Sequence, residues 1–325
     1  MTNTMNISIA MATHNGSSHI MEQLESFAEQ SVLPDELVVC DDCSMDDTVE
    51  VISQFKRTAP FEVRLIENEE KLGHVQNFAK AMAQCSGDIV FLSDQDDSWF
   101  PNKIQTILQI FDQEPKCWIV VHDGELTNGQ LAPSGQTKMS QIRNGYRTAE
   151  GISTGALSAI RRDLLKYALP IPPGIKTHDT WLHQLASPFP GRRLAIDQAL
   201  QYIRRHEQNT SSWVVNSSRK LSRVDVFRAQ LKTSPSSDYT DRFAMNAGLA
   251  NAFGQMRGEL TDATDISALQ RAEARLASER KAIYSRQTLV KLGFLKRRLQ
   301  ATSMLLRGEY VYFNGIRSFV RDILR

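Results

Sequence analysis

The sequence predicts an α/β protein in which helices flank a mostly parallel sheet and a helical region follows. Five short apolar runs alternate with segments of helical periodicity within the first 123 residues. Turn residues such as the His-Asn-Gly at 14–16 close the runs. Beyond about residue 215 the pattern is helical to the end. Strands separated by helices of this length form βαβ units, which favours a parallel, Rossmann-like sheet.

The elements of the first half can be assigned in chain order. The predicted strands cover residues 6–13, 36–42, 62–68, 87–93 and 117–123. Between them, apolar residues recur on one helical face. Ser44 and Asp47 have capping-box spacing before the second helix, and Pro101 stands where the fourth could begin.

The pattern is weaker in the middle of the chain. Residues 122–150 are rich in Gly, Ser, Thr and Gln, which predicts a long loop, and such loops are often functional. A strand or turn and a short helix are expected over 152–173, and a helix over 178–186. Two short strands and a polar loop are expected over 192–213. We therefore predict one α/β domain over residues 1–213.

Composition and charge exclude several classes of protein. The chain has 325 residues, of which 41% are hydrophobic and 23% charged, as in ordinary globular proteins. Its net charge of +1 gives no case for a nucleic-acid partner. The charge is uneven, because residues 281–325 hold ten Lys and Arg against two Asp and Glu. A helical region over 214–325 with a basic tail over 281–325 therefore follows an acidic body.

The chain shows no sequence signal that directs it out of the cytoplasm. Its first residues carry no basic segment ahead of a long apolar stretch, as a signal peptide would. No apolar run reaches the roughly 18 residues that a membrane span needs. Cys40 and Cys43 form a CxxC, but no second pair follows, which argues against zinc. We expect a cytoplasmic location.

Polar clusters follow three predicted strands, at 13–15, 41–42 and 93–97. Parallel sheets bind ligands beyond the carboxyl ends of their strands, so these clusters should share one edge. Asp94, Asp96 and Asp97 fall within four positions. A helix cap would explain one of these carboxylates, whereas all three together require a nearby positive charge. Mg²⁺ prefers oxygen ligands and often binds substrate phosphates together with one or two carboxylates.

Two familiar nucleotide motifs are missing from the sequence. There is no GxxxxGK[ST] loop and no GxGxxG after the first strand. A P-loop NTPase and a dinucleotide dehydrogenase are therefore not supported. The remaining kind of nucleotide site is a sheet edge that holds the nucleotide through side chains and a metal.

Five separated stretches then resemble the family 2 glycosyltransferases of the GT-A fold. They read SIAMATHNG, ELVVCDDCSMDDT, EEKLGHVQNFAKAMAQCSGDIVFLSDQDDSWFPNKI, HDTWLHQLA and YIRRHEQNTS, and span about residues 5–213. The nearest subgroup is similar to bacterial rhamnosyltransferases that build cell-surface polysaccharide such as O-antigen. The C-terminal third carries no motif of comparable strength.

The resemblance implies a role for each matching residue. Asp94 and Asp96 would form the Asp-x-Asp motif and hold Mn²⁺ or Mg²⁺, with His206 as the late metal or diphosphate ligand. Asp179 would be the catalytic base. His178 and Trp181 would lie on the acceptor side. The residues implied at the nucleotide-sugar site are Ala12, Thr13, Asn15, Asp42, Lys71, Asn77 and Asp94.

The implied reaction is inverting transfer of rhamnose or a similar hexose from a nucleoside-diphosphate sugar to a hydroxyl. The acceptor would be a saccharide or a lipid-linked molecule. Two alternatives stay open: a sugar nucleotidyltransferase and a non-catalytic nucleotide-sugar-binding protein. The first usually needs a glycine-rich basic signature early in the chain, which THNGSSHI lacks.

The basic tail has two interpretations. Leu292, Leu295, Leu299 and Leu306 lie roughly along one helical face among Lys and Arg, which is typical of an interfacial helix. It would contact the membrane surface and place the protein peripherally at the inner face of the plasma membrane. A helical subdomain packed on the catalytic body explains the same pattern.

Overall fold

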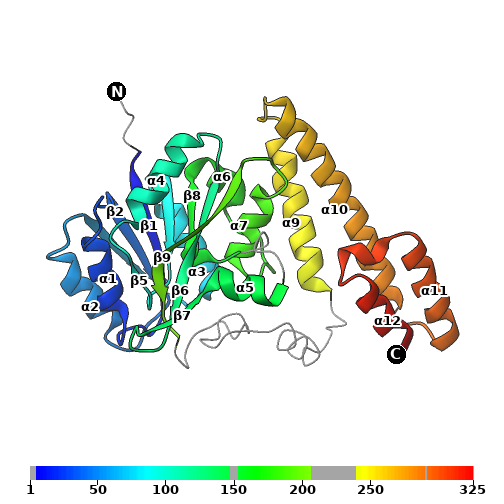
Figure 1. The fold of residues 1–325 in the computed structure, drawn as a ribbon, viewed down its shortest axis with the longest axis horizontal. Coiled ribbons are helices and arrows are strands. Elements are labelled where there is room, and N and C mark those ends of the chain that lie inside the picture. The colour runs from blue at the N-terminus through cyan, green and yellow to red at the C-terminus, as the bar shows by residue number, and fades with distance from the viewer. Residues whose placement is uncertain (1–4, 147–152, 206–238, 290, 325) are drawn as a thin grey trace. The chain divides into compact units, whose positions relative to one another are not determined.

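The computed structural model describes residues 5–146, 153–205, 239–289 and 291–324 (Figure 1). The chain divides into two compact units. The first comprises Met1–Ile171, Thr177–Ser187 and Gly191–Thr233, and the second comprises Pro172–Lys176, Pro188–Pro190 and Ser234–Arg325. The boundary predicted at residues 213 and 214 falls outside the described residues.

The first unit is built on a sheet that has nine strands within the described residues. Its first half has the order β3-β2-β1-β4, all parallel. These strands are β1 (Ile7–Thr13), β2 (Glu36–Asp41), β3 (Glu62–Glu67) and β4 (Ile89–Ser93). The connections are α1 (Ile20–Ala28), α2 (Thr48–Lys56) and α3 (His74–Gln84). This half confirms the predicted alternation of strand and helix.

The second half of the sheet is mixed. It continues from β4 in the order β8-β6-β9-β5, with β7 paired to β6. β6 and β9 are parallel to each other, whereas β5, β7 and β8 run antiparallel to their neighbours. The strands are β5 (Ser98–Trp99), β6 (Ile119–Thr127), β7 (Pro133–Thr137), β8 (Ser158–Arg161) and β9 (Arg193–Ile203). The helices are α4 (Lys103–Gln113), α5 (Lys138–Tyr146), η1 (Gly155–Leu157), α6 (Arg162–Ala168) and α7 (His178–Ala186).

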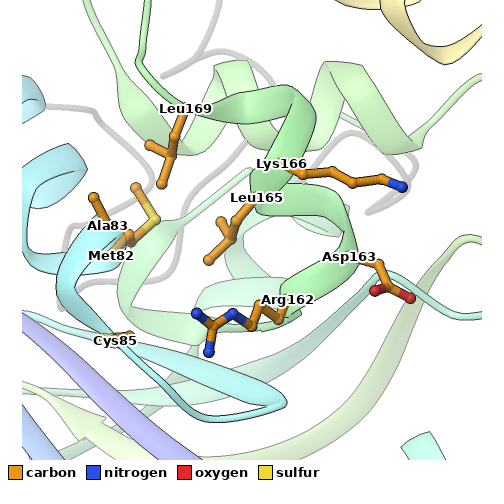
Figure 2. A pocket seen from close by; sticks show the side chains of 8 residues that line it. All are labelled: Met82, Ala83, Cys85, Arg162, Asp163, Leu165, Lys166 and Leu169. Carbon is orange, nitrogen blue, oxygen red and sulfur yellow. The ribbon is translucent and has the colours of Figure 1, made fainter.

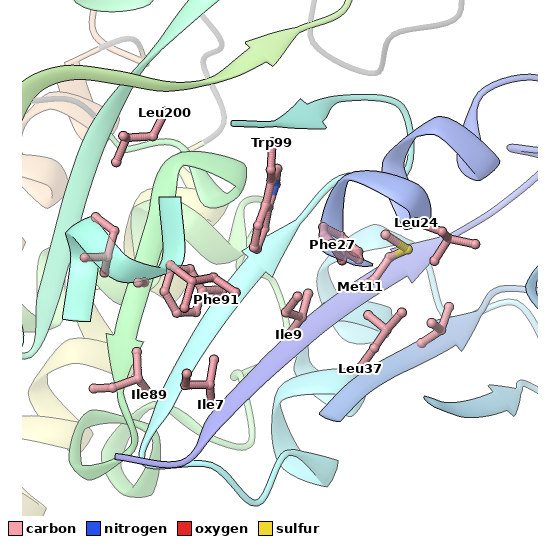
Figure 3. Close-up of a cluster of buried hydrophobic side chains, with 14 of the residues drawn as sticks. Ile7, Ile9, Met11, Leu24, Phe27, Leu37, Ile89, Phe91, Trp99 and Leu200 are labelled. Atoms are coloured by element: carbon pink, nitrogen blue, oxygen red, sulfur yellow. The ribbon is translucent and has the colours of Figure 1, made fainter. Parts of the chain in front are cut away.

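The core of this unit follows the two-residue period of the strands. Ile7, Ile9 and Met11 of β1 point to one side of the sheet and are buried (Figure 3). Phe27 of α1 packs edge-on against Trp99, with ring centroids 4.6 Å apart. Burying these aliphatic and aromatic side chains gives the sheet a rigid base.

Three segments differ from the sequence-based expectation. The loop expected over 122–150 is replaced, as far as residue 146, by the end of β6, the strand β7 and the helix α5. No residue of β7 is buried and its sequence PSGQT alternates no apolar residues, so it lacks the pattern that would have signalled a strand. β9 is one strand where two short ones were expected. The strand β5 precedes α4, so the helix begins after Pro101.

The second unit is helical. It consists of α9 (Thr240–Met256), α10 (Ala263–Leu289), α11 (Phe294–Leu306), η3 (Glu309–Tyr312) and α12 (Ile316–Leu324). Leu289, Ala301, Met304 and Tyr310 form a buried cluster of their own. The Arg286 guanidinium donates to both carboxylate oxygens of Asp322, at 2.8 and 3.1 Å. The basic tail is therefore a packed helical segment, and no described helix is long and apolar enough to span a bilayer.

One buried histidine predicts how stability depends on pH. His183 accepts from Arg193 Nε at Nδ1 (2.8 Å), and its Nε2 lies 2.9 Å from Ser158 Oγ, whose proton goes to Thr154 O. His183 is therefore the neutral Nε2–H tautomer. Burial lowers its pKa to about 3. Below the unfolded value of about 6.5 the unfolded chain binds the extra proton, so stability falls as pH falls, by up to about 1.4 kcal/mol per unit.

We expect His183→Gln to flatten this dependence. Between pH 7 and pH 5 the wild type should lose about 2 kcal/mol more unfolding free energy than the variant. Urea unfolding followed by tryptophan fluorescence at both pH values measures this difference. Equal losses in the two proteins would show that His183 is not held neutral.

Candidate active site

A cleft of about 1220 Å³ opens at the carboxyl ends of β1, β2 and β4. The strand register creates it, because Thr13 pairs with Asp41 and Met11 pairs with Ser93. The polar residues after each strand therefore meet at one edge, as predicted. Of the residues singled out from sequence, those that line the cleft are Ala12, Thr13, Asn15, Asp42, Lys71, Asn77, Asp94, Asp96, His178 and Asp179.

Two of the singled-out residues do not join this group. Trp181 is only 1% exposed, and its indole N–H donates to the backbone oxygen of Ala168 at 2.9 Å. The structure therefore places it in the core beneath α7. His206 lies outside the described residues.

The acidic turn after β4 is held by β9. Asp97 is buried and accepts from Gln201 Nε2 at 2.7 Å and from the Arg204 backbone N–H at 3.1 Å. The Arg204 side chain donates from Nε to the backbone oxygen of Asp96 at 2.8 Å and also pairs with Glu22. Asp97 therefore anchors the turn and does not cap α4, which begins after Asn102 without a side-chain cap.

A buried lysine completes this anchor. Lys103 is fully buried, and its Nζ donates to Gln201 Oε1 at 2.6 Å and to the Ala156 backbone oxygen at 3.3 Å. The Lys103 nitrogen also lies 3.6 Å from the centroid of the Trp99 ring. Gln201 thus bridges the amine of Lys103 and the carboxyl of Asp97 inside the protein, where burial lowers the pKa of Lys103 well below its usual range. This chain of contacts fixes the turn from beneath.

The remaining carboxylates of the turn open onto the cleft. The surrounding protein keeps water from the Asp94 carboxyl, and this desolvation, together with the nearby charges of Asp96 and Asp179, raises its pKa. Burial and the nearby charges of Asp96 and Asp94 raise the pKa of Asp97 well above its usual range. Grouped carboxylates of this kind are stabilised by a cation.

These residues fit a divalent cation. Asp94 and Asp96 supply hard oxygen donors at a place where negative charge accumulates. Within the described residues no group of three or more His, Cys, Asp or Glu side chains is arranged around one metal position. A metal held here would therefore complete its coordination with substrate oxygens, water or a residue outside the described ranges.

Asp42 organises the other wall of the cleft. Its Oδ1 accepts from the Leu72 N–H at 2.7 Å and from Asn68 Nδ2 at 3.0 Å, and its Oδ2 accepts from the Gly73 N–H at 2.8 Å. These bonds lower the pKa of Asp42 despite its burial. A carboxylate has about four acceptor positions, so one remains for a ligand. Asn77 has both amide groups engaged, by Asn68 and the Cys40 backbone.

Asp179 stands in the first turn of α7, opposite the acidic turn. Its Oδ1 accepts from the Thr180 N–H at 2.6 Å. Asp179 acts electrostatically on Asp94, so the two carboxylates face the same space. His178 stacks on Phe78 at 4.1 Å, and a Cβ on Gly155 would lie 2.5 Å from its Nε2. A glycine at 155 is thus needed to fit the imidazole ring.

The structure adds cleft residues that sequence reasoning missed. Lys138, at the start of α5, acts on Asp94, Asp97 and Asp179, and burial lowers its pKa to about 8. Arg205 lines the same wall. Gln95 fixes the turn after β1 by accepting from the His14 N–H at 2.9 Å and donating to the His14 oxygen at 3.1 Å. One signal in the sequence points to Lys138: it falls within residues 122–150, which are predicted to form a functional loop at this edge of the sheet.

A second pocket of about 340 Å³ lies between the end of α3 and α6 (Figure 2). Its lining combines the apolar side chains of Met82, Leu165 and Leu169 with the charged residues Arg162, Asp163 and Lys166. None of the sequence-predicted site residues lines it. The larger cleft is therefore the candidate active site.

The Gln201 bridge predicts a specific loss of stability. Gln201→Leu leaves both Lys103 and Asp97 buried without this partner, and we expect a loss of about 2–4 kcal/mol of unfolding free energy. Gln198→Leu is the matched control, since Gln198 is an exposed residue of the same strand. It should cost under about 0.5 kcal/mol. Urea unfolding measures the unfolding free energy of both variants. Equally small losses in the two would contradict a stabilising role for the Gln201 bridge.

Comparisons with known proteins agree with this geometry. Residues 8–168 match the model of the family described as glycosyl transferase family 2. An uncharacterized glycosyltransferase of Nostoc sp. is 26% identical over 63% of this chain and 66% of its own length. The dTDP-rhamnosyl transferase RfbG of Shigella flexneri is 31% identical over 30% of this chain. That match covers 35% of RfbG, so the chain spans under two thirds of both relatives.

Solved structures support the fold. TarS of S. aureus (residues 1–349) superposes with a TM-score of 0.58 at 16% identity, covering 98% of this chain and 89% of TarS. The mannosyltransferase PcManGT of Pyrobaculum calidifontis gives a TM-score of 0.52 at 18% identity, over 85% of this chain and 81% of its own. The match shows a glycosyl transferase family 2 domain over residues 8–168, and the sheet with the helices around it has the GT-A fold.

Proposed function

We propose that the protein is an inverting glycosyltransferase. It moves a hexose from a nucleoside-diphosphate sugar to a hydroxyl of a cell-surface polysaccharide or a lipid-linked acceptor. The observation that carries the proposal is that Asp94 and Asp96, from the turn after β4, and Asp179, from the first turn of α7, line one cleft. The first two suit a metal-bound diphosphate, and Asp179 suits a base for the acceptor.

The choice of donor rests on the relatives. TarS has been solved with UDP and with UDP-GlcNAc, and PcManGT with GDP-Man and Mn²⁺. RfbG is named a dTDP-rhamnosyl transferase. These names support a nucleoside-diphosphate sugar. We propose rhamnose or a similar hexose as the sugar, because RfbG is 31% identical to this chain over 102 residues.

The nucleotide would lie along the β1–β2 side of the cleft. The remaining acceptor position of Asp42 suits an N–H of the base. Ala12, Thr13 and Asn15 border this position. Lys71 lies 2.8 Å from His14 Nε2 and places an ammonium at the rim, where it can meet a phosphate.

The diphosphate would lie against the acidic turn. Asp94 and Asp96 would hold Mn²⁺ or Mg²⁺, which supplies charge stabilisation to the leaving diphosphate. Lys138 and Arg205 line the same region and add fixed positive charge. His206 follows Arg205 directly and remains the further ligand that the family resemblance suggests.

Asp179 would remove the proton of the attacking hydroxyl. Its Oδ1 is oriented by the Thr180 N–H, and Oδ2 can face the acceptor. His178 beside it is neutral, since burial lowers the pKa of its imidazole. Attack then occurs on the face of the sugar opposite the leaving diphosphate, which inverts the anomeric carbon.

The two alternatives predict different products. A nucleotidyltransferase would make a sugar nucleotide from a sugar phosphate and a nucleoside triphosphate, and a binding protein would leave the sugar nucleotide intact. We also propose that the protein acts in polysaccharide assembly, such as O-antigen synthesis, at the cytoplasmic face of the plasma membrane. A lipid-linked acceptor would make contact with that surface useful.

The reaction can be tested with Asp179→Asn. Wild-type protein, Mn²⁺ and a panel of dTDP-rhamnose, UDP-GlcNAc and GDP-mannose should release a nucleoside diphosphate with at least one donor. The variant should lose about 10²- to 10⁴-fold in kcat, because it lacks the base, while donor KM changes little. Released nucleoside diphosphate and transferred sugar are measured by chromatography.

Asp163→Asn is the matched control, because Asp163 also stands in the first turn of a helix and is exposed. It should retain wild-type turnover. Near-wild-type turnover in Asp179→Asn would instead assign Asp179 to the helix terminus alone. Release of pyrophosphate from a triphosphate would favour the nucleotidyltransferase.

A further inference from the structure

Exposed apolar side chains gather in the last two helices. In the part of the chain that the structure describes, 13 large hydrophobic residues are exposed, and eight of them fall between 294 and 324. A packed soluble surface exposes such residues singly, whereas a concentration of them marks an interaction site. The eight are Phe294, Leu295, Leu299, Leu306, Val311, Ile316, Val320 and Leu324.

α11 has apolar residues on two opposite sides. Ala301 and Met304 are buried in the core of the helical unit. Leu295, Leu299 and Leu306 are 74%, 74% and 84% exposed. Spacings of four and eleven residues place these leucines within about 40° of one another around the helix, away from the core side. The unit's own packing uses one side of α11 and leaves the leucine row uncovered.

α12 repeats this arrangement. Ser318 and Asp322 are buried toward the unit, where Asp322 is bound by Arg286 and by Tyr310 Oη at 3.0 Å. Ile316, Val320 and Leu324 recur every four residues and are 60%, 47% and 75% exposed. Two helices of one unit therefore each present an apolar row outward.

Basic residues accompany both rows. Lys296 and Arg298 directly flank the α11 row, and Arg317 and Arg321 alternate with the α12 row. The acidic residues of this segment are engaged, because Glu309 pairs with Arg307 at 2.8 Å and Asp322 with Arg286. Residues 281–325 carry a net charge of +8 in a chain whose total is +1. The surface around the rows is thus strongly positive.

We propose that α11 and α12 dock on an anionic lipid bilayer. The rows Leu295/Leu299/Leu306 and Ile316/Val320/Leu324 enter the boundary between headgroups and acyl chains, and the neighbouring Lys and Arg bind the lipid phosphates. A second copy of the chain fits less well, because it would bring the same +8 against this surface. The proposal names the partner surface for the membrane contact suggested above. It does not depend on the donor, the metal or the base.

Flotation of the full chain with vesicles tests the proposal. We compare phosphatidylcholine vesicles with vesicles containing 30% phosphatidylglycerol. The wild type should float at least fivefold more with the anionic vesicles, and 0.5 M NaCl should remove most of this binding. The triple variant Leu295→Gln/Leu299→Gln/Leu306→Gln should lose at least fivefold. Its helices should survive, since these side chains are exposed, and circular dichroism checks this.

Leu33→Gln/Ile266→Gln is the matched control, because it removes exposed apolar side chains elsewhere and should float like the wild type. Equal flotation of the triple variant, or no preference for anionic vesicles, would overturn the proposal. The proposal would also be overturned if the wild type does not float, elutes as a dimer in size-exclusion chromatography, and the triple variant elutes as a monomer. That result would assign the apolar rows to contact with a second copy of the chain. Hydrolysis of the sugar nucleotide should persist in the triple variant, so failure of the docking and failure of the proposed chemistry are distinguishable.

Discussion

The structure depends on one electrostatic constraint, the gathering of carboxylates at a single edge of the sheet. Asp94, Asp96 and Asp97 lie there, Asp179 of α7 lines the same cleft, and burial together with neighbouring carboxylates raises the pKa of Asp94 and of Asp97. Beneath this edge, buried hydrogen bonds lead from Lys103 through Gln201 to Asp97. Anchoring Asp97 in this way fixes the turn, so Asp94 and Asp96 remain available to a ligand without rearrangement.

Local patterns predicted the first half of the sheet because each strand and helix there carries its own period. The edge location of Asp42 and Asp94 followed from the parallel topology alone. The anchor could not be predicted, because Gln201 and Arg204 reach the acidic turn across more than 100 residues of sequence. The hairpin of β6 and β7 was missed because β7 buries no side chain and carries no apolar alternation. The family resemblance implied that Trp181 lies on the acceptor side, whereas in the structure its indole N–H donates to the buried backbone oxygen of Ala168.

The two walls of the cleft differ in how many of their hydrogen-bonding groups are already satisfied by the protein itself. On the wall formed by Asp42, the side chains of Asp42 and Asn77 are largely engaged by backbone and amide groups, which shapes the wall and leaves little free hydrogen-bonding capacity. On the opposite wall, carboxylates and cations such as Lys138 face a shared space. This division suits a ligand with a neutral base at one end and a diphosphate at the other. The helical unit has its own core and outward apolar rows, and by docking on a bilayer it would hold the enzyme at the membrane surface.

The central claim is that the acidic edge forms a cation site which a nucleoside diphosphate completes. Electron paramagnetic resonance of Mn²⁺ titrated into the protein, with and without a nucleoside diphosphate, measures this directly. Mn²⁺ should bind more tightly when the diphosphate is present, and Asp96→Asn should abolish the gain. Asp197→Asn, an exposed carboxylate on β9 paired with Arg143, should leave the gain intact. Equal Mn²⁺ binding in the wild type and Asp96→Asn, with or without the diphosphate, would contradict the account.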